Sequence, residues 1–150
     1  MAELPSGVFT FLATDIEGSV ELWQRNEVAM SVALARHDRI LRETVLLYGG
    51  RVVKGSGDGI WAVFARPTPA FDAALAIQAA MRATVWGEPG ELRVRVAIHA
   101  GAAELRDGDY YGSTPNRLAR LVERVRGRQI LVSEATVTLA GPEATTRFTL

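Results

Sequence analysis

Two aspartates in this 150-residue sequence stand where a carboxylate can bind a cation. Asp15 directly follows a run rich in β-branched and aromatic residues, and Asp58 lies in the stretch GSGDG, residues 55–59. If the two segments are neighbours in the fold, the carboxylates can face each other. Such a pair suits a hard cation, Mg²⁺ or Mn²⁺, whose other ligands are water and phosphate oxygens.

Each aspartate also has a structural interpretation. Asp15 could cap the helix expected just after it, because aspartate accepts hydrogen bonds from the first backbone N–H groups of a helix. In the other interpretation, the N–H groups of Gly18 and Ser19 in this turn bind phosphate. Asp58 followed by Gly59 is a favoured two-residue hairpin turn, which needs no ligand. The residues alone leave these alternatives open.

A second group of polar residues lies near the end of the chain. Asn116 and Arg120 are four residues apart on an expected helix and therefore share one of its faces. The apolar residues of this helix form a separate stripe that would face the core: Leu118, Leu121, Val122 and Val125. Asn116 and Arg120 point away from that stripe, either into solvent, as most helix arginines do, or toward a ligand.

The two histidines are not candidates for catalysis or metal binding. His99 ends an alternating strand, where we expect a packed, hydrogen-bonded side chain, and His37 is expected at the surface. With no cysteine and no cluster of partners, neither histidine indicates a zinc site. The glycine-rich stretch around Asp58 is not a Walker loop or a dinucleotide fingerprint, because no helix follows its glycines.

The elements that must position these residues alternate along the chain. The periodicity predicts strands at residues 7–16, 51–54, 59–65, 92–101 and 129–133, with another within 102–113 and a last one beginning at 144–150. Helices are expected at 17–23, 27–48, 70–85, 116–126 and 134–141. This order predicts an α+β fold, an α/β sandwich whose mostly antiparallel sheet is covered mainly on one face by helices. The helix at 27–48 should bury Val28, Val32, Leu34, Ile40, Leu41, Val45 and Leu46.

The composition limits the classes of partner. Seventeen basic residues balance seventeen acidic ones, so attraction to a nucleic acid polymer is not expected. No apolar run approaches the roughly 20 residues of a membrane-spanning helix, and the first residues lack the features of a signal peptide. The absence of cysteine fits a reducing compartment. We therefore expect a single cytoplasmic domain, residues 1–150, with no membrane segment.

Four motifs in this order resemble the class III nucleotidyl cyclase catalytic domain. They are FLATDIEGSVELW, GGRVVKGSGDGIWAVF, VRVAIHAG and DGDYYGSTPNRLARL, at residues 11–23, 49–64, 94–101 and 107–121. From Phe9 to about Leu139 the chain is similar to bacterial stand-alone adenylyl cyclase homology domains, mycobacterial ones included. The resemblance implies a ferredoxin-like βαββαβ core with an additional strand and helix.

The resemblance also implies a role for each matching residue. Asp15 and Asp58, with the backbone carbonyl of Ile16, match the ligands of two divalent cations, Mg²⁺ or Mn²⁺. Gly18 and Ser19 would then bind substrate phosphate.

The remaining matches concern the nucleoside and the reacting phosphate. Lys54 and Asp109 match the pair that reads adenine in adenylyl cyclases. Asn116 matches the asparagine that positions the ribose, and Arg120 matches the arginine that stabilises the transition state.

The implied activity is that of an adenylyl cyclase. The ribose 3′-oxygen of ATP attacks the α-phosphate, giving 3′,5′-cyclic AMP and pyrophosphate. Family members act as head-to-tail dimers in which one subunit supplies the metal aspartates and the other supplies the remaining residues, so a homodimer is expected. The alternatives are a guanylyl cyclase, disfavoured by Lys54 and Asp109, and a non-catalytic module for regulation or dimerisation. A diguanylate cyclase is disfavoured because its GGDEF-type hairpin is absent.

The sequence departs from the family pattern in two ways. The family's C-terminal strand pair, which carries a lysine that contacts the triphosphate, is expected to be short here, and that lysine has no assigned counterpart. Within the motifs, the unusual residues are Ala13, Val20, Pro115 and Leu118.

Overall fold

The computed structural model describes residues 7–142. Its strands are β1 (Gly7–Ile16), β2 (Arg51–Ser56), β3 (Gly59–Phe64), β4 (Val94–Arg106), β5 (Asp109–Tyr111) and β6 (Ile130–Val132). Its helices are α1 (Ser19–Arg25), α2 (Glu27–Leu47), α3 (Pro67–Ala83), α4 (Ser113–Val122) and α5 (Glu134–Ala140). None of these helices is long and apolar enough to cross a bilayer. The strand expected at residues 144–150 lies outside the described residues.

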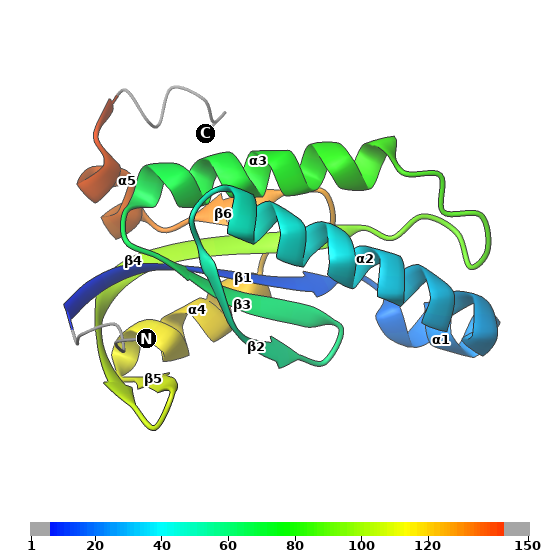
Figure 1. Ribbon diagram of the computed structural model, residues 1–150, viewed down its shortest axis with the longest axis horizontal. Coiled ribbons are helices and arrows are strands. Elements are labelled where there is room, and N and C mark those ends of the chain that lie inside the picture. Colours follow the sequence, from blue (N-terminus) through cyan, green and yellow to red (C-terminus); the bar gives the residue numbers. More distant parts are fainter. Residues whose placement is uncertain (1–6, 143–150) are drawn as a thin grey trace.

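The strands form one sheet in the order β2-β3-β1-β4-β5, with β6 beside β4. The β4–β6 pairing is parallel and the others are antiparallel. Figure 1 shows α2 and α3 on one face of the sheet and α4 on the other. This architecture confirms the predicted α+β sandwich with a mostly antiparallel sheet.

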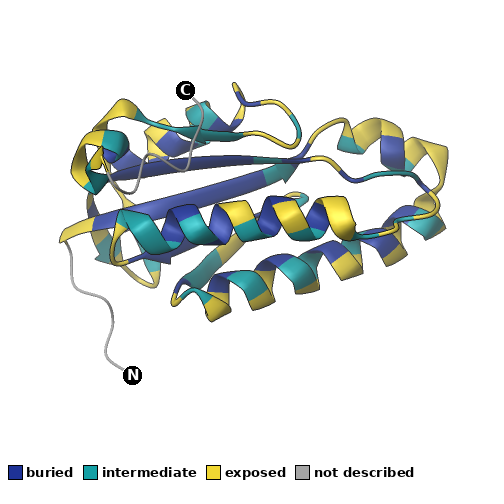
Figure 2. Ribbon diagram, turned by 90° about the horizontal axis from the view of Figure 1, so that it is seen from above, coloured by how far each residue is buried: buried dark blue, intermediate teal, exposed yellow. Residues whose placement is uncertain are grey.

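The alternation of side chains along β1 divides the core into two parts. Leu12 packs on the side of α2 and α3, whereas Phe11 and Ala13 pack with Leu118 of α4. The central strands are buried along most of their length, and the helices are buried along one side (Figure 2). Because alternate residues of a strand share a face, Asp15 lies on the same face as Ala13, the face that α4 covers.

The buried face of α2 differs from the predicted stripe. Val28, Val32 and Leu46 are exposed. The buried residues follow the three-to-four spacing of a helix and are Met30, Ala33, His37, Leu41 and Val45. His37 has 0% exposure, so the expectation of a surface histidine is wrong. Its place in the helical period, midway between Ala33 and Leu41, decides its burial in spite of its polarity.

The burial of His37 should make the stability of the protein depend on pH. Burial lowers the pKa of His37 below its ordinary value of 6.5 and outweighs the opposing contact between Nδ1 and Asp38 Oδ1. The unfolded chain therefore binds this proton more readily, and the free energy of unfolding should fall as the pH drops from about 6.5 toward the lowered pKa. Urea unfolding between about pH 7.5 and 5 checks this. The slope should become shallower in His37→Leu, and an unchanged slope would contradict the assignment.

The boundaries of α3 and α4 differ from the predicted ones by a few residues. α3 begins at Pro67 rather than residue 70, and α4 runs from Ser113 to Val122 rather than over 116–126. A proline in the first turn of a helix sacrifices no helical hydrogen bond, so α4 accommodates Pro115 near its start. Pro115 and Leu118 are both buried. These two departures from the family pattern therefore belong to the packing of α4 against the sheet.

Candidate active site

The two carboxylates predicted to bind metal lie on neighbouring segments of the sheet. β1 and β3 pair antiparallel, so the end of β1 meets the beginning of β3. At Gly59, a Cβ atom would stand 1.7 Å from the carbonyl oxygen of Thr14 and 3.1 Å from the Cα atom of Asp15. Only glycine permits this approach. It brings Asp58, the residue before Gly59, beside the end of β1.

Asp58 also occupies the turn of the β2–β3 hairpin. Ser56 pairs with Gly59, and Gly57 between them has a φ of 59°. The Oδ1 atom of Asp58 accepts a long hydrogen bond of 3.4 Å from Trp23 Nε1. The turn and the position beside β1 are therefore compatible interpretations of the same residue.

The capping interpretation of Asp15 is wrong. The residue that precedes α1 is Gly18, with a φ of 67°, and no side chain caps this helix. Ile16 ends β1 as a buried residue, and Ser19 begins α1. The turn that carries Gly18 and Ser19 thus directly follows the strand that bears Asp15.

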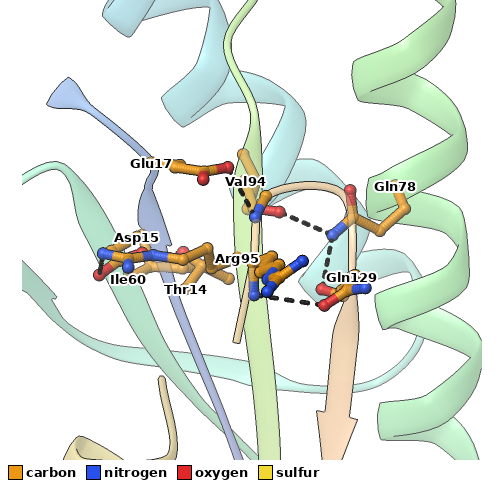
Figure 3. A network of polar contacts seen from close by, with 10 residues as sticks. Thr14, Asp15, Glu17, Ile60, Gln78, Val94, Arg95 and Gln129 are labelled. Carbon is orange, nitrogen blue, oxygen red and sulfur yellow. Dashed lines mark hydrogen bonds and ion pairs between the residues drawn. The ribbon is translucent and has the colours of Figure 1, made fainter. Parts of the chain in front are cut away.

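The side chain of Asp15 is bound by Arg95, a residue that the sequence did not single out. The two stand opposite each other on β1 and β4. Arg95 Nε donates to Asp15 Oδ1 at 2.5 Å and Nη2 donates to Oδ2 at 2.6 Å (Figure 3). The hydrogen bond with Asp15 raises the pKa of Arg95. The alternation of VRVAIHAG already placed Arg95 on one face of its strand with His99, and this was the available signal.

The donor groups at the end of β1 fit a hard divalent cation. Asp15 and Asp58 offer carboxylate oxygens, and the carbonyl of Ile16 is a further hard donor. Such a small set leaves ligand positions for water and phosphate, as Mg²⁺ and Mn²⁺ require. Within residues 7–142, no three His, Cys, Asp or Glu side chains are grouped so that they could hold a metal.

Lys54 and Asp109 meet although β2 and β5 are the outermost strands along the sheet. Lys54 Nζ lies 3.5 Å from Asp109 Oδ2 and 4.9 Å from the centroid of the Trp61 ring. A shift of register between Val52 and Lys54 makes this possible. It sets Lys54 opposite Trp61 on the α4 face, whereas in a regular strand Lys54 would share the face of Val52. No sequence pattern indicated this β-bulge.

Asn116 and Arg120 are exposed on α4, as predicted. Arg120 lines a cavity of about 410 Å³ together with Arg117 and Arg124. These two arginines were not singled out from the sequence. Arg117 lies three residues before Arg120 on the same side of α4, and Arg124 lies just beyond the end of the helix. None of the three takes part in an ion pair between described residues. The exposed side of α4 is therefore a cationic surface.

His99 lies beside these arginines as a neutral, packed side chain. Its Nδ1 atom is 2.6 Å from Ser133 Oγ. Burial, followed by the charge of Arg117, lowers the pKa of His99 below 6.5. The prediction of a packed, hydrogen-bonded histidine is confirmed.

The described contacts do not connect all the predicted site residues with one another. No hydrogen bond or ion pair that the structure describes links Asp15 or Asp58 to Asn116 or Arg120. Lys54 and Asp58 share the β2–β3 hairpin, but Lys54 contacts Asp109 and Asp58 contacts Trp23. The two charged residues of this hairpin therefore have different partners in the chain.

Comparison with known proteins identifies the family of the chain. Residues 5–149 match the sequence model described as the adenylate and guanylate cyclase catalytic domain. An uncharacterised protein of Mycobacterium tuberculosis is 36% identical over 134 residues, which cover 88% of this chain and 45% of that protein. The adenylate cyclase of Schizosaccharomyces pombe is 30% identical over 160 residues, which cover 90% of this chain and 10% of that protein.

The fold is also similar to that of solved structures. The structure of adenylate cyclases from Trypanosoma brucei in their monomeric state superposes with a TM-score of 0.89 at 26% identity, covering 97% of this chain and 81% of that one. The chain spans less than half the length of its mycobacterial relative, with 45% covered. Its sequence motifs, its fold and the match over nearly its whole length establish that the chain belongs to the class III adenylate and guanylate cyclase catalytic domain family.

Proposed function

We propose that this domain is an adenylyl cyclase, which converts ATP into 3′,5′-cyclic AMP and pyrophosphate. The proposal depends chiefly on the donor and acceptor that Lys54 and Asp109 place 3.5 Å apart on the α4 face. A lysine can donate to a ring nitrogen of adenine while a carboxylate accepts from its amino group, and guanine presents the reverse pattern. The sequence contains no other lysine that could take this role.

The phosphate end of the substrate would bind at the end of β1. Asp15, Asp58 and the carbonyl of Ile16 would hold two divalent cations there. When bound, these cations supply charge neutralisation on the triphosphate and a lower pKa for the attacking hydroxyl. The backbone N–H groups of Gly18 and Ser19 would donate to phosphate oxygens.

The residues of α4 would act on the ribose and on the reacting phosphate. Asn116 would orient the ribose so that its 3′-oxygen is aligned with the α-phosphate, which is a positioning effect. Arg120 would donate to the oxygens on which negative charge develops in the transition state. The exposure of both side chains makes them accessible to a substrate held by another subunit.

A head-to-tail homodimer would combine the two groups of residues. Asp15 and Asp58 of one subunit would face Lys54, Asp109 and the α4 residues of its partner. The different contacts of the two hairpin residues support this arrangement, since Lys54 pairs with Asp109 whereas Asp58 accepts from Trp23. Each dimer would then contain two equivalent composite sites.

The base preference is the direct test of the proposed substrate. The purified protein, incubated with Mn²⁺ and either ATP or GTP, should form cyclic AMP with a kcat/KM at least about a hundredfold above that for GTP, since a mismatched base leaves buried polar groups unpaired. Mass spectrometry of the product checks this. Comparable turnover of the two nucleotides, or no cyclic product, would refute the proposal.

A variant pair locates the preference in Lys54. Lys54→Met should lower kcat/KM for ATP and shrink the ratio of ATP to GTP turnover, because the donor to the adenine ring is lost. Arg106→Met is the matched control, since Arg106 is an exposed cation on the neighbouring β4–β5 hairpin that pairs with Glu104 at 3.0 Å. Arg106→Met should have the same ratio of ATP to GTP turnover as the unmodified protein.

A further inference from the structure

Both carboxylate oxygens of Asp15 are already bound to a cation of the protein itself. Arg95 makes the bidentate contact at 2.5 and 2.6 Å, and the two side chains are only 25% and 28% exposed. A bidentate contact between ionised groups is among the strongest hydrogen-bonded arrangements in proteins, and partial burial limits its screening by solvent. Arg95 thus occupies the oxygen atoms that a divalent cation would use.

The backbone around Arg95 is held firmly in place. Gln78 of α3, which is 2% exposed, donates from Nε2 to the carbonyl oxygens of Val94 at 2.9 Å and Gln129 at 3.1 Å. Arg128 N–H also donates to Val94 at 2.8 Å. Figure 3 shows these contacts on one side of β4 and the Asp15–Arg95 pair on the other. These hydrogen bonds hold the backbone next to Arg95, whereas the contact with Asp15 is made by the side chain alone.

We propose that Arg95 is a built-in counter-ion that competes with the divalent cation for Asp15 and so sets the metal concentration at which the site fills. The proposal rests on the proposed function, in which Asp15 and Asp58 bind metal. In the metal-free state Arg95 neutralises Asp15 and holds it in one orientation. A cation can bind both oxygens of Asp15 only when the guanidinium group withdraws.

Removal of Arg95 should therefore strengthen metal binding. Without its positive charge, the partly buried carboxylate of Asp15 has no counter-ion, and Asp58 stands beside the same segment of β1. A nearby unit charge repels a divalent cation strongly in such a partly desolvated place, so Arg95→Gln should lower the Kd for Mn²⁺ roughly tenfold. Arg95→Lys keeps the charge but loses the planar guanidinium group. Its Kd for Mn²⁺ should therefore lie between the Kd of the unmodified protein and that of Arg95→Gln.

The experiment measures Mn²⁺ binding by the purified protein without nucleotide. Electron paramagnetic resonance measures the concentration of free Mn²⁺ in solutions of the unmodified chain, Arg95→Gln, Arg95→Lys and Asp58→Ala. Arg93→Gln is the matched control, since Arg93 is an exposed cation two residues away that faces Glu91 at 3.5 Å. Circular dichroism verifies that each variant is folded.

The possible results separate this inference from the proposed function. Tighter Mn²⁺ binding in Arg95→Gln, with Arg93→Gln unchanged, supports competition. Equal or weaker binding in Arg95→Gln, while Asp58→Ala still abolishes binding, overturns the role of Arg95 and leaves the metal site intact. Binding that is absent or insensitive to Asp58→Ala in every variant overturns the metal site, and the inference with it.

Discussion

Replacement of Asp58 by alanine should lower the kcat for cyclic AMP formation at least about a thousandfold, which corresponds to roughly 4 kcal/mol of transition-state stabilisation. The substitution removes one of the two carboxylates at the metal site, whereas little of the fold depends on it. The hydrogen bond between Asp58 and Trp23 is long, at 3.4 Å, and the residue lies in a turn. Steady-state kinetics with Mn²⁺ and ATP measures the loss.

The control for Asp58→Ala is a carboxylate away from the site. Glu43 is exposed on α2 and is not one of the proposed site residues, so Glu43→Ala removes the same charge without changing the site. It should retain nearly full turnover, and both variants should unfold at urea concentrations close to that of the unmodified protein. Substantial cyclic AMP formation by a folded Asp58→Ala variant would contradict the assignment of Asp58 to the metal.

Replacement of Arg120 by alanine should lower kcat by about a hundredfold to a thousandfold with a smaller change in KM. Arg120 is assigned to the charge that develops during the reaction, so its loss weakens binding of the transition state more than binding of ATP. Because Arg120 is exposed and has no described ion pair, the fold should tolerate the substitution. The kinetics of the purified variant separate kcat from KM.

Arg124, just beyond the end of α4, offers the matched control. It follows Arg120 by four residues and lines the same cavity of about 410 Å³. Arg124→Ala should therefore weaken kcat far less than Arg120→Ala. Equal losses of kcat in the two variants would mean that this surface contributes only its general positive charge. An unchanged kcat in Arg120→Ala would show that Arg120 has no role in the mechanism.

Local patterns in the sequence were sufficient to predict most of the elements. The apolar run before Asp15 predicts β1 at its observed bounds, and the glycines around Asp58 predict the β2–β3 hairpin. The spacing of Asn116 and Arg120 predicts their shared, exposed side of α4. In each of these cases the information is local, because a strand, a turn or a helix face depends on residues close together in the chain.

The features that the sequence did not reveal depend on partners far away in the chain. The bulge before Lys54 is a shift in the pairing of β2 with β3, so it depends on both strands. Arg95 can bind Asp15 only because the register of β1 and β4 sets the two residues opposite each other. His37 has the polarity of a surface residue, but the helical period turns it into the core. The structure thus differs from the expectations drawn from local sequence patterns where strand pairing or burial depends on residues far apart in the chain.

The composite site is tested most directly by mixing the two inactive variants. In a dimer of Asp58→Ala with Arg120→Ala, one site combines the intact Asp58 of one chain with the intact Arg120 of the other, and the second site lacks both. Random pairing makes about half of the dimers mixed, so turnover should recover to about a quarter of that of the unmodified protein. Differently tagged copies allow the mixed dimer to be isolated. Recovery of cyclic AMP formation in that dimer is the predicted result, and an isolated mixed dimer as inactive as either parent would contradict shared sites.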